Sequence, residues 1–494
     1  KKDSLYYLPG DIAGITGIER AYEKQLRGEK GMRYIQKDIK LRNVGPYKNG
    51  ELDKEVVSGK DLTLTIDYDL QRIAEEMLVN KHGAIVALDP NNGEILALAT
   101  GPDIDPNLFT GPNKKRNIYR LANDTIYDNK PTYDRSVQAA YPPGSPFKLL
   151  TALAGYQMKV ISDSTKFTCR HGYRMGRHTI GCHCGTFWPI GMEKAIEKSC
   201  NNYFSSVFYK ITEKYGPKGR NRAIDEWKEI MNSFGLGEFM NNDLAVGAKG
   251  KIPSGEFYTK RLGEKWHPYE SAIFNGMGQG DVLLTPLQMA NFTAAIVNRG
   301  WYFTPHIVKS IDGKPNPDER FKKKHVTKVE PRYFDVVLKG MKDVFIGGTA
   351  RGLASKEFTQ LGKTGTAQVP GGKDNSIFVM AAPADKPKIV VVAVMEHAGF
   401  GATWAGPAST IIAEKYLLGD IKRTYLYDRM IKSSFMGEYK RMYINHLTKK
   451  GWYTVPKPDP IQLKKLEDSL RLLNEKKAAQ NPKKLKDTAK NNKT

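Results

Sequence analysis

The sequence lacks any long hydrophobic run. Its most apolar stretch, Ile389 to Met395, is far shorter than the roughly 20 residues of a membrane-spanning helix, so we expect a buried strand there. It also lacks a signal peptide. Because the sequence begins at Lys1 and not at a methionine, we expect it to be part of a longer chain, so the missing span does not exclude a membrane anchor.

Acidic residues are scarce: 53 Asp and Glu stand against 77 Lys and Arg, for a net charge of +24. This balance predicts attraction to polyanions such as an anionic membrane, an acidic polymer or nucleic acid. The sequence has no nucleic-acid-binding motif and no aromatic-basic repeat, so we expect no nucleic-acid partner. Residues 420–494 carry 19 Lys or Arg and 8 Asp or Glu. We interpret them as a basic C-terminal extension with a disordered end.

Cysteine is also rare, but the four cysteines are clustered within about 32 residues, among three of the nine histidines. Such clustering indicates a metal site or two disulfides. The spacing lacks the paired Cys-x-x-Cys of common zinc knuckles, so the spacing leaves both alternatives open. The residues are Cys169, Cys182, Cys184 and Cys200, with His171, His178 and His183 between them.

The length of 494 residues exceeds what one hydrophobic core supports, so we expect more than one domain. Residues 1–60 show weak periodicity and indicate a small irregular module. Residues 61–419 read as an α+β domain with a cysteine-rich insertion at 165–200. We expect strands at 61–66, 83–90, 94–100, 362–369, 378–382 and 388–396, a loop at 101–140, and helices at 68–79, 145–158, 221–234, 286–299 and 403–418.

Ser145 opens the segment that points most clearly to chemistry. The turn Tyr141-Pro-Pro-Gly144 leads into the predicted helix, and Pro146 suits the first helical position. Residues three apart on a helix share a face, so we expect Lys148 beside the Ser145 hydroxyl. A neutral, partly desolvated lysine can take the serine proton and activate the nucleophile. A Ser-x-x-Lys pattern alone is a weak signal, because such a pattern is more often an ordinary helix start.

Two further polar motifs follow in the chain. Ser199-Cys200-Asn201 offers a hydroxyl that can relay protons and an amide that can hold a substrate carbonyl. Lys363-Thr364-Gly365-Thr366 lies in a predicted strand, where Gly365 permits close approach of a substrate backbone and Lys363 and Thr366 can bind a carboxylate. The order Ser-x-x-Lys, Ser-x-Asn, Lys-Thr-Gly is the signature of penicillin-binding proteins and serine β-lactamases.

The chain resembles class B penicillin-binding proteins of the elongation type (penicillin-binding protein 2) beyond these motifs. The similarity covers roughly residues 10–418, and residues 105–109 favour the elongation branch over the division branch. It implies a penicillin-binding/serine β-lactamase-like transpeptidase domain, an antiparallel sheet flanked by helices, at 61–419, with a pedestal remnant before it. The resembling segments are 17–28, 83–98, 105–109, 141–148, 277–280 and 362–368.

The resemblance implies a peptidoglycan D,D-transpeptidase of cell elongation and shape maintenance, inhibited covalently by β-lactams and needing no organic cofactor. Ser145 would attack the penultimate D-Ala carbonyl of a stem peptide, with Lys148 as base. The backbone N–H groups of Ser145 and Thr366 would stabilise the oxyanion. Ser199 and Asn201 would assist proton transfer and placement, and the donor carboxylate would bind at Lys363, Thr364, Gly365 and Thr366.

The resemblance also implies a metal, a location and partners. Many elongation-type relatives hold a metal in this insertion, so we expect a structural zinc ion on Cys169, Cys182, Cys184 and Cys200, with Cys200 pointing away from the cleft. His183 or His178 is an alternative to Cys184, and two disulfides are the alternative to zinc. The expected location is the periplasmic face of the bacterial inner membrane, through a single-pass anchor outside this sequence. The expected partners are stem peptides, their lipid-linked precursor, β-lactams, a polytopic glycosyltransferase and proteins of the elongation machinery.

Two other interpretations stay open at this point. A β-lactamase or D,D-carboxypeptidase of the same superfamily would use the same serine but resolve the acyl-enzyme with water. A non-catalytic basic scaffold protein would explain the charge. The lifetime of a penicillin adduct separates these interpretations, because a transpeptidase keeps the adduct, a β-lactamase turns it over and a scaffold forms none.

Overall fold

The computed structural model describes residues 6–8, 11–124 and 129–450. The chain divides into two units, Lys1–Tyr439 and Lys440–Thr494. Of the second unit only residues 440–450 are described, and they include the end of helix α15 (Met436–Lys449). The disorder predicted for the end of the chain lies outside the described residues. The first unit contains the whole candidate site.

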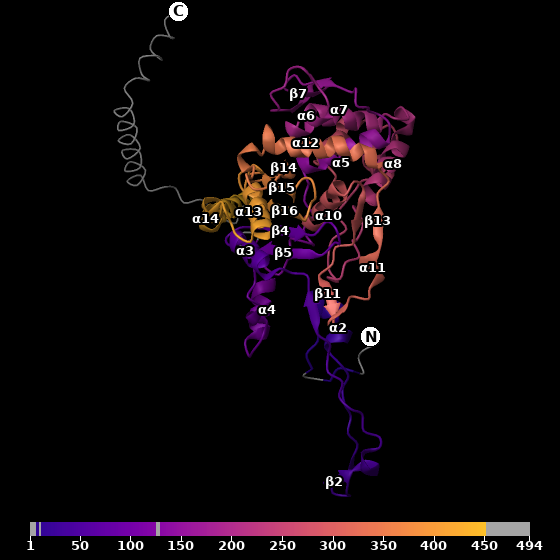
Figure 1. The fold of residues 1–494 in the computed structure, drawn as a ribbon, viewed down its shortest axis with the longest axis vertical. Helices are drawn as coiled ribbons and strands as arrows, with labels where there is room; N and C mark the ends of the chain where they lie inside the picture. The colour runs from indigo at the N-terminus through magenta and orange to yellow at the C-terminus, as the bar shows by residue number, and fades with distance from the viewer. Residues whose placement is uncertain (1–5, 9–10, 125–128, 451–494) are drawn as a thin grey trace, which may run out of the picture. The chain divides into compact units, whose positions relative to one another are not determined.

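An antiparallel five-stranded sheet forms the centre of the first unit (Figure 1). The strand order is β14-β15-β16-β4-β5, so β14 is an edge strand. The register places Lys363 opposite Val379 and Val392 opposite Val86. Strands β4, β15 and β16 are buried along their whole length, which their near-continuous apolar sequences require. The bounds are β4 (Gly83–Leu88), β5 (Ile95–Gly101), β14 (Leu361–Ala367), β15 (Asn375–Ala382) and β16 (Ile389–Met395).

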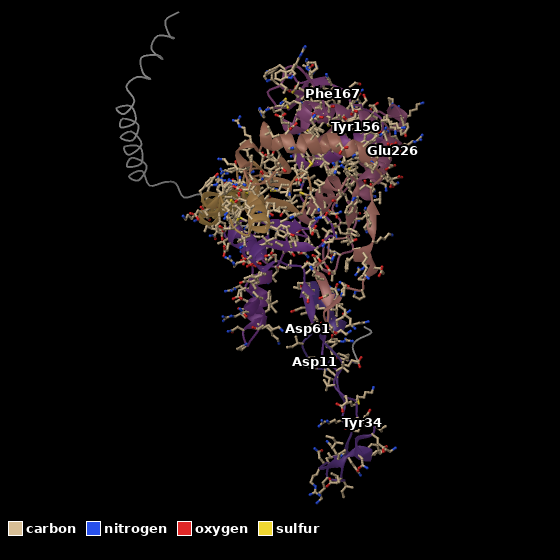
Figure 2. The ribbon with its side chains drawn as sticks, in the orientation of Figure 1. Asp11, Tyr34, Asp61, Tyr156, Phe167 and Glu226 are labelled. Atoms are coloured by element: carbon tan, nitrogen blue, oxygen red, sulfur yellow. The ribbon has the colours of Figure 1, made fainter. Side chains whose placement is uncertain are left out.

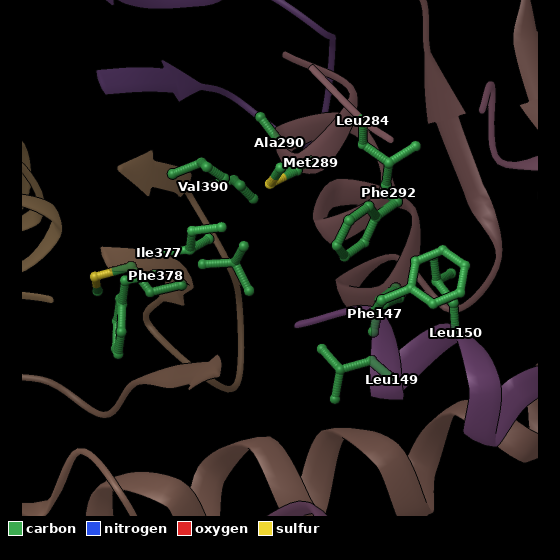
Figure 3. Packing of buried hydrophobic residues seen from close by; sticks show 14 of the residues in the cluster. Phe147, Leu149, Leu150, Leu284, Met289, Ala290, Phe292, Ile377, Phe378 and Val390 are labelled. Atoms are coloured by element: carbon green, nitrogen blue, oxygen red, sulfur yellow. The ribbon is translucent and has the colours of Figure 1, made fainter. Parts of the chain in front are cut away.

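Helices cover both faces of this sheet. Helices α10 and α13 each pack over β15, β16 and β4. Figure 1 shows them on opposite sides of these strands. Helix α3 joins α13, whereas α5 and α12 lie with α10. Figure 3 shows Phe147 and Leu149, Phe292 of α10 and Ile377 of β15 within one buried cluster. The helices are α3 (Tyr68–Leu78), α5 (Lys148–Gln157), α10 (Pro286–Val297), α12 (Phe334–Ile346) and α13 (Ala405–Leu418).

The predicted α+β fold with an antiparallel sheet flanked by helices is confirmed. Asp67 is the N-cap of α3 and accepts a hydrogen bond from the Leu70 N–H at 3.1 Å. The loop predicted for residues 101–140 is wrong in part, because it contains η2 (Pro106–Phe109) and α4 (Lys114–Ala122). Only Leu121 of α4 is buried, and the other residues of this helix are mostly polar or basic, so its sequence resembles that of a surface loop.

The N-terminal residues form a narrow module with short elements. Figure 2 shows Tyr34 in this thin part of the ribbon. The module connects to the rest of the unit through Tyr22, whose hydroxyl donates to Asp243 at 3.1 Å and accepts from Asn316 at 3.0 Å. Strand β3 pairs with β11 and not with the central sheet. The elements are α1 (Gly17–Ala21), α2 (Glu23–Leu26), β1 (Ile35–Lys37), β2 (Asn43–Pro46), β3 (Leu62–Leu64) and β11 (Val308–Ile311).

The cysteine-rich insertion contains two small antiparallel pairs, β6 with β9 and β7 with β8. No helix of the described residues is long and apolar enough to cross a membrane. The remaining helices and strands are β6 (Phe167–Thr168), β7 (Gly172–Met175), β8 (His178–Gly181), β9 (Pro189–Ile190), α6 (Met192–Glu197), α7 (Asn201–Thr212), α8 (Arg220–Ser233), α9 (Gly255–Leu262), β10 (Trp301–Phe303), β12 (Lys314–Pro315), α11 (Glu319–Lys322), β13 (Lys324–Val326) and α14 (Thr424–Lys432).

Candidate active site

Ser145 opens the 3-10 helix η4 (Ser145–Phe147), which continues directly into α5. The turn before it depends on two glycines. Gly144 has φ +61°, and its N–H donates to the Gly278 carbonyl at 2.8 Å. A Cβ atom at Gly278 would lie 2.2 Å from the Gly144 carbonyl oxygen, so only glycine allows these turns to meet. The Ser145 hydroxyl is therefore held on a rigid turn.

The ammonium group of Lys148 lies at the centre of a hydrogen-bond network. Its Nζ donates to the Ser199 carbonyl at 2.8 Å, to Ser199 Oγ at 3.2 Å and to Asn201 Oδ1 at 2.6 Å. Ser199 Oγ in turn donates to Ser145 Oγ at 3.0 Å. The sequence predicts Lys148 directly beside the Ser145 hydroxyl, whereas the hydrogen bonds of the structure connect the two through Ser199.

Burial changes the proton affinity of this lysine. Lys148 is completely buried, and desolvation lowers its pKa to about 8, although the cysteine cluster nearby acts in the opposite direction. At pH 7 about a tenth of the Lys148 side chains would then be neutral, and this fraction grows up to about pH 8. A neutral lysine that is hydrogen-bonded to Ser199 can accept a proton from Ser145 through the Ser199 hydroxyl.

Ser199 adopts a strained backbone conformation with φ +53°. A non-glycine residue in this region costs of order 1–3 kcal/mol and persists where the surroundings enforce it. On its C-terminal side, Cys200 is the N-cap of α7, and Asn201 Nδ2 donates to the Gly181 carbonyl at 2.7 Å. The Ser199-Cys200-Asn201 loop is thus tied both to α7 and to the cysteine-rich insertion.

The predicted Lys-Thr-Gly segment forms edge strand β14, which contacts η4. A Cβ atom at Gly365 would lie 2.7 Å from Pro146 Cδ, so the missing side chain lets the strand approach the serine turn. Thr364 Oγ1 lies 2.6 Å from Thr349 Oγ1. Lys363 is completely buried, and burial, together with the charge of Lys148, holds its pKa well below the usual range. A bound carboxylate would favour its charged form.

These segments meet in one open cleft of about 1040 Å³. Its lining includes the four predicted hydroxyl residues of the site, Ser145, Ser199, Thr364 and Thr366, whereas the amino groups of Lys148 and Lys363 lie in the buried wall. The sequence analysis missed several lining residues that come from separate segments and carry no motif of their own. They are Thr349, Gln279, Tyr269 and Asp374. Gln279 could have been found in the resembling segment 277–280; its Nε2 donates to the Thr366 carbonyl at 3.3 Å.

The four cysteines lie together beside this cleft. All four are buried and unoxidised, and their sulfur atoms lie within 4.8 Å of one another. The Sγ atoms of Cys182 and Cys200 are 3.9 Å apart. The hydrogen bond between Cys182 and Cys200 is the main cause that lowers the pKa of Cys182 to about 4. The residues are Cys169, Cys182, Cys184 and Cys200; His178 and His183 line the cleft.

The fold and this site have the arrangement of the penicillin-binding and serine β-lactamase class: Ser145 opens a helix beside an edge strand that carries the Lys-Thr-Gly motif. Residues 83–418 match the penicillin-binding protein transpeptidase domain, and residues 1–64 match the penicillin-binding protein dimerisation domain. The first match covers more than half of the chain, so the chain belongs to the penicillin-binding protein transpeptidase family.

Individual members of this family show which relatives the chain resembles. The chain is 34% identical to the peptidoglycan D,D-transpeptidase MrdA of Acinetobacter baumannii over 442 residues, which cover 82% of this chain and 61% of that protein. The crystal structure of Pseudomonas aeruginosa PBP2 has a TM-score of 0.68 and 32% identity, covering 84% of this chain and 86% of that chain. Helicobacter pylori PBP2, solved as a complex with MreC, has a TM-score of 0.68 and 26% identity, covering 85% and 75%. The chain spans 61–65% of the length of the MrdA proteins of A. baumannii, Haemophilus influenzae and Escherichia coli.

Proposed function

We propose that this chain is a peptidoglycan D,D-transpeptidase that cross-links stem peptides through a serine acyl-enzyme. One observation carries the proposal: Lys148 Nζ, Ser199 Oγ and Ser145 Oγ form a continuous chain of hydrogen bonds of 3.2 and 3.0 Å that ends at the open cleft. A serine hydroxyl becomes a nucleophile only when a base takes its proton. The neutral fraction of buried Lys148 supplies such a base.

In the acylation step, Ser145 Oγ bonds to the carbonyl carbon of the penultimate D-Ala while its proton moves through Ser199 to Lys148. The backbone N–H groups of Ser145 and Thr366 hold the resulting oxyanion. The bond to the terminal D-Ala then breaks, and its amine takes the proton back from Lys148. The products are free D-Ala and an ester on Ser145.

In the second step, an amine of another stem peptide attacks the ester carbonyl. Its proton returns to Ser145 Oγ by the same route, and a new peptide bond replaces the ester. The terminal carboxylate of the donor binds to Lys363, Thr364 and Thr366. Asn201 positions the carbonyl group of the donor. A β-lactam enters through the same carboxylate site, and its ring opens onto Ser145, because it mimics the donor peptide.

The test is intact-protein mass spectrometry after incubation with benzylpenicillin. We expect one stable adduct on the wild type and none on Ser145→Ala. Rapid drug turnover without a lasting adduct would instead indicate a β-lactamase. Neither adduct nor turnover would favour the non-catalytic scaffold protein. A stable adduct on both proteins would show that another residue is the nucleophile.

The similarity to MrdA supports a role in cell elongation and shape maintenance. We place the protein at the periplasmic face of the inner membrane, with stem peptides and their lipid-linked precursor as substrates and β-lactams as inhibitors. The complex of H. pylori PBP2 with MreC supports an elongation-machinery partner of this kind. We also propose a polytopic glycosyltransferase as partner, and chemistry without an organic cofactor.

The cysteine cluster fits a structural zinc ion. In a tetrahedral site with Zn–S bonds of about 2.3 Å, sulfur atoms lie about 3.8 Å apart, and the Cys182 and Cys200 sulfurs lie 3.9 Å apart. A disulfide needs about 2.05 Å. We therefore propose Cys169, Cys182, Cys184 and Cys200 as the ligands. The ion would act as a crosslink that holds the Ser199–Asn201 loop against the insertion.

A further inference from the structure

Asp374 is the one carboxylate among the described residues that line the cleft. It is half-buried, and no hydrogen bond or ion pair joins its carboxylate to another residue of the described ranges. Lys198, which also lines the cleft, already forms an ion pair with Glu197 at 3.2 Å and donates a hydrogen bond to the Gly347 carbonyl at 2.7 Å. The cleft therefore offers one uncompensated negative charge to whatever binds in it.

The sheet fixes the position of this carboxylate. Side chains alternate along a strand, so Thr364, Thr366 and Gln368 lie on one side of β14, and all three line the cleft. The last pair of the two strands is Ala367 with Asn375, and continuing this register by one residue beyond both strands would bring Asp374 opposite Gln368. The Asp374 carbonyl accepts a hydrogen bond from the Gly399 N–H at 2.7 Å, which holds the backbone at this point.

The direction of a bound donor follows from the same strand. An extended peptide can lie along a free sheet edge, and β14 is such an edge. If the terminal carboxylate of the donor is bound between Lys363 and Thr366, the residues that precede the scissile bond extend away from Lys363. They extend toward Gln368, and therefore toward Asp374.

We propose that the Asp374 carboxylate binds an ammonium group on the side chain of the residue that precedes the penultimate D-Ala of the donor peptide. This assignment rests on the proposed transpeptidase function. It assigns to Asp374 the recognition of a free amine on that side chain at the moment of acylation. Asp374 is a specificity-determining residue that takes no part in bond making.

The experiment compares two donors, acetyl-L-Lys-D-Ala-D-thiolactate with its side-chain amine free and the same compound with that amine acetylated. Acyl-enzyme formation on Ser145 is followed by mass spectrometry. For the wild type, we expect kcat/KM to favour the free amine about tenfold, the size of one charged hydrogen bond. Asp374→Asn keeps the shape, removes the charge and should bring the ratio to about one. The control variant is Asp385→Asn, at an exposed aspartate, which should keep the wild-type ratio.

Each rate is divided by the benzylpenicillin acylation rate of the same variant, which removes effects on the nucleophile. An unchanged preference in Asp374→Asn, or no preference in the wild type, would overturn the assignment. If Asp374→Asn changed only the transfer to an added amino-acid acceptor, the ammonium group would belong to the acceptor, and the donor assignment would be wrong. Failure of benzylpenicillin to acylate the wild type would sink the proposed function itself, so the two failures are distinguishable.

Discussion

At the scale of single residues, the Ser145 site could be read from the sequence only in part. The spacing of Ser145 and Lys148 predicts that they share a face, because three residues form nearly one helical turn. Spacing alone could not place Ser199 between them, since Ser199 lies 51 residues from Lys148 and 54 from Ser145; its part in proton transfer was implied by the resemblance. Asp374 was missed for the same reason: it reaches the cleft only through the pairing of β14 with β15.

The lowered pKa of Lys148 predicts how acylation depends on pH. Below about pH 8 the lysine is mostly protonated and cannot accept the serine proton. We therefore expect the second-order rate of benzylpenicillin acylation to rise about tenfold per pH unit up to about pH 8 and then to level off. Lys148→Arg, which stays protonated, should lose acylation throughout the range, whereas Lys159→Arg in the surface turn after α5 should keep the profile.

The profile is measured by rapid-quench mass spectrometry from about pH 6 to about pH 10. A flat profile, or acylation by Lys148→Arg at a rate close to that of the wild type, would show that Lys148 is not the base. The lysine would then serve only to place Ser199 and Asn201.

At the scale of secondary-structure elements, strongly patterned segments were predictable and polar ones were not. The apolar strands of the central sheet and the helices that cover it follow from their sequences. Helix α4 does not, since it buries only Leu121. In the cysteine-rich insertion, the sequence showed only that the four cysteines are close along the chain. The convergence of their sulfur atoms depends on the fold, in which the β7–β8 pair lies near the N-terminus of α7.

The proposed zinc site makes a prediction for Cys200→Ser. Cys200 stands between Ser199 and Asn201, so loss of the ligand should release the loop that carries both residues. We expect the zinc content to fall from one ion per chain to well below one. We also expect the rate of benzylpenicillin acylation to fall about 10- to 100-fold, the loss that is typical when residues that hold metal ligands in place are mutated. Zinc is measured by elemental analysis of protein that has not been exposed to chelators.

The matched control is His183→Ala, because His183 is a cleft-lining neighbour of two cysteines and not a member of the sulfur cluster. This variant should keep its zinc. Loss of zinc from it would mean that His183 replaces a cysteine as a ligand. A wild-type protein that contains no zinc and whose mass is four hydrogens lower would have two disulfides instead.

At the scale of the whole molecule, residues 420–439 pack against Lys81 and His82, which directly precede strand β4 of the central sheet. Lys81 is buried, and its ammonium group donates to the Ser433 carbonyl at 2.8 Å. The Tyr439 ring stacks on His82 with centroids 3.9 Å apart. Its hydroxyl accepts from the His82 N–H at 2.9 Å and donates to the Glu396 carbonyl at 3.2 Å. Composition indicated only a basic extension here, because contacts across about 350 residues leave no local pattern.

These contacts extend toward the serine. The Glu396 carboxylate accepts from the Tyr141 hydroxyl at 2.7 Å and from Arg135 Nε at 3.0 Å. Tyr141 opens the turn that leads to Ser145. Two hydrogen bonds in series therefore connect residues 420–439 to the Ser145 turn: Tyr439 holds the backbone of Glu396, and the side chain of Glu396 holds Tyr141.

Tyr439→Phe tests this connection, since it removes the hydroxyl and keeps the stacked ring. The His82 N–H and the Glu396 carbonyl then lose a buried partner, which costs about 1–3 kcal/mol of the free energy of unfolding. Tyr425→Phe is the control, because Tyr425 is 64% exposed, and it should change stability by less than about 0.5 kcal/mol. Both are measured by urea unfolding. Equal free energies of unfolding for the two variants would show that the hydrogen bonds of Tyr439 do not stabilise the first unit. In that case the acylation rate of Tyr439→Phe should also match that of the wild type.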